Sequence, residues 1–137
     1  MHGYICSKMK VSIEKFIPAF SWFIISLVLL TLPGSVFLKK HWLDDIQFDK
    51  MVHIGLFSIL VFLSFIPLIN VSISLRKKKS ILVCIALIAF AYGILMEFVQ
   101  KHWVTNRSFD VLDILADGIG SFLPLIFFKR IISWGRK

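Results

Sequence analysis

The chain has 137 residues, 58% of them hydrophobic, and a formal net charge of +8. The length suits a single domain, and the hydrophobic share excludes an ordinary soluble globular protein. Most of the positive charge flanks apolar segments, so we expect it to anchor helix ends and expect no nucleic-acid partner.

Four apolar segments are long enough, or nearly so, to cross a bilayer, because a hydrocarbon core of about 30 Å needs roughly 20 helical residues. They cover residues 16–38, 51–70, 80–100 and 110–134. The first is long for a signal peptide and has no A-x-A-like site at its end, so we expect it to be retained. The sequence therefore predicts an all-α membrane protein, a single domain over residues 1–137 with four transmembrane helices in a small bundle.

Lysine and arginine positions predict the orientation of these helices. With the N-terminus inside, the cytoplasmic segments hold 11 of the 16 basic residues: three in the N-terminal lead, four at 76–79 and four at the C-terminal end. The positive-inside rule then places both termini and the predicted turn SLRKKKS, residues 74–80, in the cytoplasm. Cys6 and Cys84 fall on this reducing side, so we expect free thiols.

Several residues predict helix ends and close contacts. Pro67 should bend or end the second helix, because proline lacks a backbone donor. Trp103 and Trp134 suit the aromatic belts at the two membrane surfaces. Gly118 and Gly120 remove side chains where the backbone of a neighbouring helix can approach.

Polar side chains concentrate at the outer ends of the second, third and fourth predicted helices. The second helix opens with Asp49, Lys50 and His53. The third carries a polar face at i, i+4 and i+7, formed by Gly93, Glu97 and Gln100. The fourth carries another at i, i+3, i+7 and i+11, formed by Asp110, Asp113, Asp117 and Ser121. A short connection containing Arg107 should bring these faces together as the walls of a buried or half-buried polar site.

The polar residues fall into three blocks that resemble the VanZ-like family of bacterial membrane proteins. The blocks are Asp49-Lys-x-x-His53, Gly93-x-x-x-Glu97-x-x-Gln100 and Arg107-x-x-Asp110-x-x-Asp113-x-x-x-Asp117-x-x-Gly120. The resemblance covers roughly residues 16–134, and it departs at Asp117, where the family usually has Asn. It implies a four-helix protein of the bacterial cytoplasmic membrane, associated with the response to glycopeptides such as teicoplanin or with envelope biology. It names neither a reaction nor a cofactor.

The charges suggest a functional site. Two cations and one histidine face five carboxylates, so some carboxylates hold protons or a cation lies among them. Ionisable residues in membrane helices are costly and are usually paired and functional. The catalytic candidates are His53, Glu97, Asp110 and Asp113. The candidates for ligand binding are Asp49, Lys50, Gln100, Arg107 and Asp117.

Three interpretations of these residues stay open. The first is an enzyme acting on an envelope lipid or lipid-linked wall precursor, with His53 paired to Asp49 or Glu97 as general base and with Lys50 and Arg107 holding a phosphate or carboxylate. The second is a binding module for a membrane lipid or protein. The third is a polar network that only ties the helices together. A hard cation could bind so many oxygens, but the sequence has no recognised metal signature, and four helices leave little room for a channel.

Overall fold

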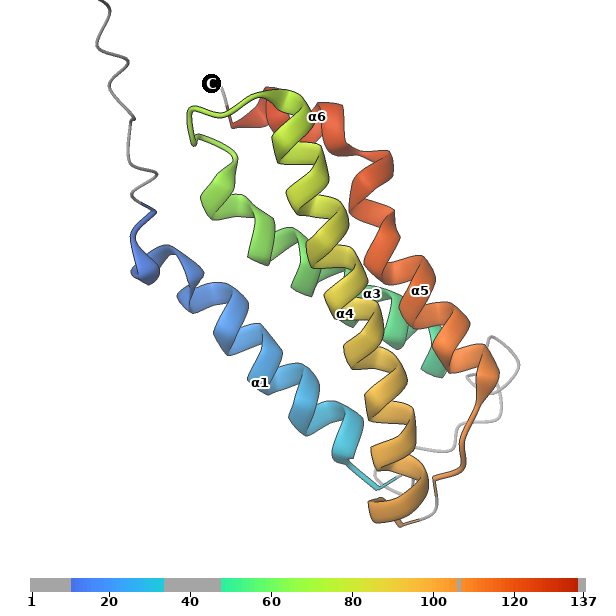
Figure 1. Cartoon of the computed structure of the whole chain (residues 1–137). Helices are drawn as coiled ribbons and strands as arrows, with labels where there is room; N and C mark the ends of the chain where they lie inside the picture. Colours follow the sequence, from blue (N-terminus) through green and yellow to red (C-terminus); the bar gives the residue numbers. More distant parts are fainter. Residues whose placement is uncertain (1–10, 34–47, 106, 136–137) are drawn as a thin grey trace, which may run out of the picture.

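A computed structural model describes residues 11–33, 48–105 and 107–135, and all regular structure in these ranges is helical. Figure 1 shows an elongated bundle in which α3, α4 and α5 lie together and α1 runs along one side. Three helical segments are long and apolar enough to cross a membrane, or four if the bent pair α5 and α6 forms one span. These spans confirm the predicted helical class and indicate a multi-pass membrane protein.

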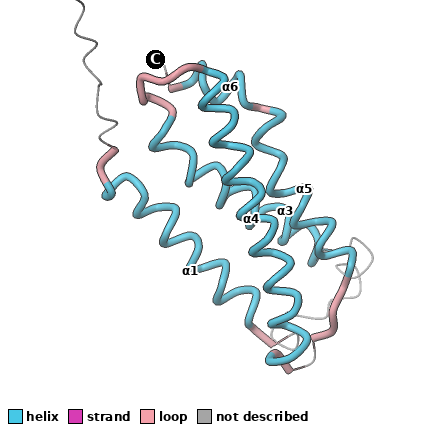
Figure 2. The backbone as a smooth tube through the Cα atoms, in the orientation of Figure 1, coloured by secondary structure: helices cyan, strands magenta, loops and turns pink. Residues whose placement is uncertain are grey.

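The helices follow one another with short connections where the chain is described (Figure 2). The first span combines a 3-10 turn with a helix, η1 Ile13–Phe16 and α1 Ile17–Thr31. The second span consists of a helix followed by a 3-10 turn, α3 Phe48–Phe65 and η3 Ile66–Leu68. The remaining helices are α4 Leu75–Trp103, α5 Val111–Ile126 and α6 Phe128–Trp134. Pro67 lies in η3, which confirms that the second helix ends there.

Polar contacts attach α1 to the rest of the bundle. The indole Nε1 of Trp22 donates to the Leu56 carbonyl of α3 at 3.0 Å, and the hydroxyls of Ser26 and Tyr92 lie 3.3 Å apart. Few residues of α1 are buried, and its exposed side chains are mostly apolar, as expected for a lipid-facing surface. The predicted end of the first span, residues 34–38, lies outside the described residues.

Helices α3 and α5 approach each other most closely at Gly120. A Cβ atom at this position would lie 2.5 Å from the backbone oxygen of Ile54 and 2.9 Å from its Cα, so only glycine permits the contact. The close approach predicted at Gly120 is therefore confirmed. Gly118 faces only the ring of Phe90, at 3.2 Å from a built Cβ atom.

The basic run at residues 76–79 is helical, so its prediction as a turn was wrong. The chain turns earlier, over residues 69–74, and α4 begins at Leu75 because the Ser74 hydroxyl accepts from the Lys77 backbone N–H as an N-cap. Lys78 is buried, and its ammonium group donates a hydrogen bond to the Ile69 carbonyl. At the other end, α4 continues to Trp103, beyond the predicted limit at residue 100.

The fourth predicted span is broken rather than continuous. Helix α5 continues past Pro124 to Ile126, and α6 then leaves it at a bend of 53°. The bend returns Ile131 and Ile132 to the apolar core, where both are buried. A straight helix would carry these two side chains past the end of the bundle, so their burial accounts for the turn.

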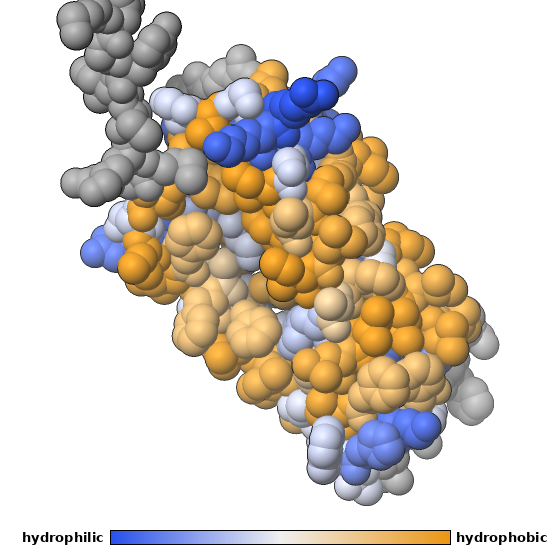
Figure 3. Space-filling view, in the orientation of Figure 1, coloured by the Kyte–Doolittle hydropathy of each residue, from blue (hydrophilic) through white to orange (hydrophobic). Residues whose placement is uncertain are grey.

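The surface and the core are both largely apolar. Figure 3 shows apolar residues over the middle of the visible face and hydrophilic residues towards the two ends of the molecule. Trp103 and Trp134 are exposed, as the predicted aromatic belts require. Cys84 is exposed and forms no disulfide among the described residues. Cys6, the other cysteine, lies outside them, so the free thiols stay a prediction.

Candidate functional site

The predicted polar faces meet. The first turns of α3, the C-terminal half of α4 and the first half of α5 bring together a set of charged and polar residues, which we call the polar cluster. Its members are Asp49, Lys50, His53, Glu97, Gln100, Arg107, Asp110, Asp113 and Asp117. The cluster lies towards the end of the bundle opposite α6 and the connection between α3 and α4 (Figure 1).

A buried hydrogen bond joins α3 to α5. His53 Nδ1 and Asp117 Oδ1 are 2.8 Å apart, and both residues are 1% exposed. With Asp117 ionised, Nδ1 carries the donated proton and Nε2 keeps a lone pair. The sequence suggested Asp49 or Glu97 as the partner of this histidine, whereas the structure gives the hydrogen bond to Asp117. A buried carboxylate that orients an imidazole in this way is typical of acid–base and metal sites.

Lys50 connects two carboxylates at the first turns of α5. Its ammonium donates to Asp110 Oδ2 at 2.9 Å and to Asp113 Oδ1 at 3.0 Å. Asp113 is buried, whereas Asp110 is more than a third exposed. These two contacts compensate the charge on the carboxylates and fix the start of α5 against α3.

Asp110 begins α5 as its N-cap. Its carboxylate accepts from the Leu112 backbone N–H at 2.8 Å as well as from Lys50. The Lys50 ammonium, and then the Leu112 N–H, hold the pKa of Asp110 below its usual range. Asp110 therefore remains ionised at neutral pH, which suits a structural acceptor better than a general acid.

Glu97 joins α4 to the beginning of α5. Its Oε2 accepts from the Asp110 backbone N–H at 3.1 Å, and the residue is fully buried. This bond satisfies a donor just before the first turn of α5. Its second oxygen, Oε1, has no partner among the described residues.

Arg107 and Asp49 form the exposed side of the polar cluster. Arg107 Nη1 lies 3.6 Å from Asp49 Oδ2, and the Asp49 side chain is 48% exposed. Asp49 was predicted to share a helix face with His53, and in the structure its ion pair is with the arginine. Gln100 lies on another side, where its Nε2 donates to the Leu30 carbonyl of α1 at 2.8 Å.

Glycine makes room for the deepest carboxylate. A Cβ atom at Gly93 would lie 2.6 Å from Asp117 Oδ2 and 2.9 Å from Asp117 Cγ. The α4 backbone therefore passes directly against this side chain. The i, i+4 and i+7 face predicted for the third helix is confirmed, because Gly93, Glu97 and Gln100 are all buried.

Several buried polar atoms of this region have no hydrogen-bond partner in the described part of the chain. They are His53 Nε2, Glu97 Oε1, Gln100 Oε1, Asp117 Oδ2 and Ser121 Oγ. Such atoms are rare in folded proteins, and each one requires a water molecule, an ion or a ligand. The network is consequently not fully closed: Lys50 and Asp110 make two contacts each, whereas His53, Glu97 and Asp117 each retain capacity for another.

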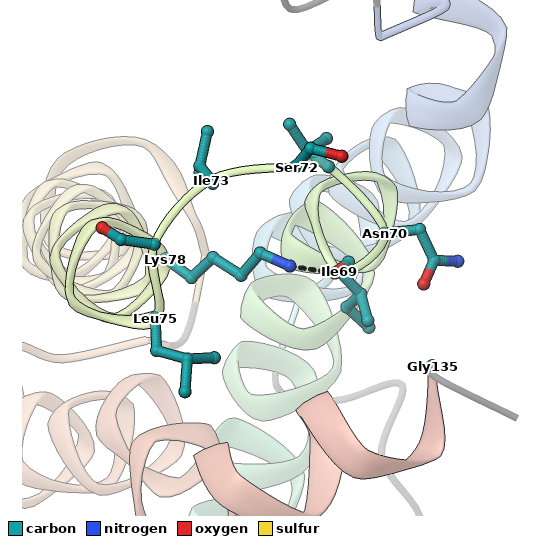
Figure 4. Close-up of a pocket in the computed structure, with 9 residues that line it drawn as sticks. Ile69, Asn70, Ser72, Ile73, Leu75, Lys78 and Gly135 are labelled. Carbon is teal, nitrogen blue, oxygen red and sulfur yellow. Dashed lines mark hydrogen bonds between the residues drawn. The ribbon is translucent and has the colours of Figure 1, made fainter.

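A pocket at the opposite end was not predicted. It has a volume of about 490 Å³ and is lined by the connection from Ile69 to Leu75 together with Lys78 and Gly135 (Figure 4). The sequence contains a signal for the burial of Lys78, since Leu82 and Ala86 follow it at i+4 and i+8 on the buried face of α4. The surrounding basic run obscured this signal.

Comparison with known proteins found no matching family model, no matching curated protein and no matching solved structure.

Proposed function

We propose that this chain is a multi-pass protein of a bacterial cytoplasmic membrane whose polar cluster acts at the outer face on the headgroup of an envelope lipid or lipid-linked wall precursor. The observation that carries the proposal is the buried hydrogen bond between His53 and Asp117, with Glu97 beside it. A structural ion pair does not need an imidazole with an unpartnered Nε2 at this depth, whereas proton transfer does.

The basic residues support the orientation. Lys78 and its basic neighbours at 76–79 lie at the beginning of α4, and Lys129 and Arg130 lie in α6. Both segments are at the end opposite the polar cluster (Figure 1). With the basic end in the cytoplasm, as the positive-inside rule requires, both termini are cytoplasmic and the cluster faces the outer leaflet.

The role proposed for each residue follows from how deeply its side chain is buried. His53 is the general base, and Asp117 orients its ring and stabilises the positive charge that develops on it. Lys50 and Arg107, nearer the surface than His53, supply positive charge where an anionic headgroup would enter. Asp113 holds Lys50 in place and lies in the first turn of α5.

The resemblance to VanZ-like proteins supports an envelope substrate. It covers all three blocks of the polar cluster and suggests that the chain influences susceptibility to teicoplanin and related glycopeptides. A headgroup at the outer leaflet is also what a site in this position could reach, because both lipid headgroups and polyprenyl-linked precursors present phosphate there.

The test is mass spectrometry of envelope lipids and lipid-linked precursors from strains that lack the protein, carry it, or carry one of two variants. His53→Gln removes the proposed base, and His102→Gln is the matched control at an exposed position. We expect the His53→Gln strain to match the deletion strain at normal membrane abundance, and the His102→Gln strain to match wild type. A His53→Gln profile equal to wild type would contradict the proposal.

A second function is supported by the contacts of Lys50 and Glu97. Lys50 joins α3 to α5, and Glu97 joins α4 to the start of α5, so the cluster also fixes the register of three helices. If that is its whole role, the polar cluster only stabilises the helices, and the chain is a binding module without chemistry. His53→Gln should then lower the membrane abundance of the protein. Precursor composition, normalised to the amount of protein, should stay unchanged.

A further inference from the structure

The deepest part of the polar cluster consists of His53, Glu97 and Asp117, which we call the buried triad. The three residues come from α3, α4 and α5, and each is at most 1% exposed. Each offers one ligand atom, and the three atoms lie within 4.8 Å of one another. Each also keeps one buried atom without a hydrogen-bond partner in the described part of the chain: His53 Nε2, Glu97 Oε1 and Asp117 Oδ2.

We propose that the buried triad binds a divalent transition-metal ion, and that Zn²⁺ matches it best. One imidazole nitrogen and two carboxylate oxygens are ligands that Zn²⁺ takes at about 2.0–2.2 Å. Ligand atoms at that distance in a tetrahedral site are ~3.4 Å from one another. The ligand atoms of the triad already lie within 4.8 Å of one another, close to this spacing.

Charge compensation points to the same ion. Among the described residues, no lysine or arginine lies within ion-pair distance of Glu97 or Asp117. Two carboxylates at this depth are costly unless positive charge accompanies them. A dication cancels both charges and leaves His53 neutral, which is the form that binds metal.

A second group is close enough to compete for the ion but is less suited to it. Asp49, His53 and Asp113 also offer ligand atoms within 4.8 Å of one another. Both carboxylates already have cationic partners, Arg107 for Asp49 and Lys50 for Asp113. Asp49 is also 48% exposed, so water competes for its oxygens. The buried triad has neither disadvantage.

The surroundings of Asp117 and His53 fit a metal centre. His53 Nδ1 and Asp117 Oδ1 are 2.8 Å apart, so an ion held by both would take the place of the proton that they share. Gly93 keeps space for the remaining oxygen, because a Cβ atom there would lie 2.6 Å from Asp117 Oδ2. One imidazole nitrogen and one oxygen of Asp117 are thus already close enough to share an ion.

Metal binding goes beyond the proposed headgroup chemistry and is measured without it. With an ion on its imidazole, His53 is a ligand and no longer the general base of the proposed function. Full-length protein without an affinity tag is purified in detergent, treated with a chelator and titrated with ZnCl2 by calorimetry. Metal content is measured in parallel on protein that has not met the chelator. We expect one Zn²⁺ per chain, with weaker binding of Mg²⁺, which prefers an all-oxygen set.

Variants locate the site. Asp117→Asn and Glu97→Gln keep side-chain size and should weaken Zn²⁺ binding by more than about 100-fold, beyond the loss typical of outer partners. His53→Gln should do the same, while His102→Gln should bind as wild type. Circular dichroism and gel filtration show whether each variant is folded. The visible absorption spectrum of wild-type protein loaded with Co²⁺ reports the ligand geometry, and this measurement does not depend on any variant.

Four other outcomes of these titrations would each change the conclusion. Absence of stoichiometric Zn²⁺ binding in folded wild-type protein overturns the inference. Loss of binding in Asp113→Asn with retention in Asp117→Asn also overturns it, because the ion then belongs to the competing group. Loss in His102→Gln with retention in His53→Gln identifies adventitious surface binding. If Zn²⁺ binds the triad but precursor composition does not depend on His53, the metal site stands and the proposed function fails.

Discussion

The two ends of the bundle both contain buried charge but stabilise it differently. Near α6, the ammonium of Lys78 donates to the Ile69 carbonyl nine residues away along the chain, a contact within one helix–helix connection. In the polar cluster, His53 bonds to Asp117 across a separation of 64 residues and Lys50 bonds to Asp113 across 63. At the α6 end, a nearby backbone carbonyl stabilises the buried charge. In the polar cluster, the stabilising contacts form only when α3, α4 and α5 hold their relative positions.

The difference indicates which end has a function beyond folding. A lysine that bonds to a carbonyl at a helix connection completes a local structure and leaves a pocket beside it. The buried side chains of His53, Glu97 and Asp117 each keep an atom that has no hydrogen-bond partner among the described residues. Burying ionisable side chains in a membrane segment costs free energy. Such side chains are therefore typical of ligand or ion sites rather than of simple stabilisation.

The orientation of the two ends gives the largest expected difference, because it is all or none. A reporter fused after residue 137 or inserted within residues 76–80 should be cytoplasmic, and one inserted within residues 105–108 should be external. Paired reporters active on opposite sides of the membrane measure both outcomes. An external signal from the insertion at residues 76–80 would place the polar cluster in the cytoplasm and remove the outer-leaflet substrate.

Asp113→Asn tests whether the polar cluster does more than connect helices. The change removes charge and keeps shape, and Lys50 retains Asp110 as a partner. If Asp113 positions Lys50 for a reacting headgroup, activity should fall by ~10²-fold at normal membrane abundance. Glycopeptide susceptibility or growth of a strain that depends on the protein measures this, with abundance determined alongside.

Glu14→Gln is the matched control for Asp113→Asn, because it also converts an acid to its amide and Glu14 is exposed in η1. It should leave abundance and activity unchanged. Full activity of Asp113→Asn at normal abundance would show that the cluster only ties the helices together.

Much of the polar cluster was predictable from spacing. The i, i+4, i+7 face of α4 and the i, i+3, i+7 face of α5 follow from helical period, and burial of Glu97, Asp113 and Asp117 confirms them. The partner of His53 was not predictable. It depends on how α3 is rotated against α5, and that rotation is set by the contact of Gly120 with Ile54, which lies far away in sequence.

The other end was harder to predict. Four consecutive basic residues favour a solvated turn, but a helix can begin inside such a run when a serine caps it, as Ser74 does for α4. Likewise, α5 continues past Pro124 to Ile126, so the proline does not end the helix, and the bend at Phe127 accompanies the burial of Ile131 and Ile132. Both features depend on tertiary packing at the connection and not on local composition.

Gly120→Ala tests the contact that positions α5. The added Cβ atom would meet the Ile54 carbonyl at 2.5 Å, so the helices must separate, at a cost of about 1–3 kcal/mol in unfolding free energy. Gly55→Ala is the matched control in α3, because nothing lies within 4 Å of its built Cβ atom. The control should be neutral or stabilising by up to about 1 kcal/mol. Unfolding in mixed micelles measures both, and equal effects would contradict the close approach.

Lys78→Met gives the smallest expected effect and tests whether the basic end is purely structural. Methionine keeps the apolar stem of the lysine and removes the ammonium, leaving the Ile69 carbonyl at the edge of a pocket where water can replace the donor (Figure 4). The loss should be about 1 kcal/mol. Lys77→Met, at an exposed position one residue earlier, should change stability by less than about 0.5 kcal/mol. Unfolding in mixed micelles and the activity assay are run on both variants. Normal activity of Lys78→Met supports a local structural role, whereas loss of activity without loss of stability would show that this end also takes part in function.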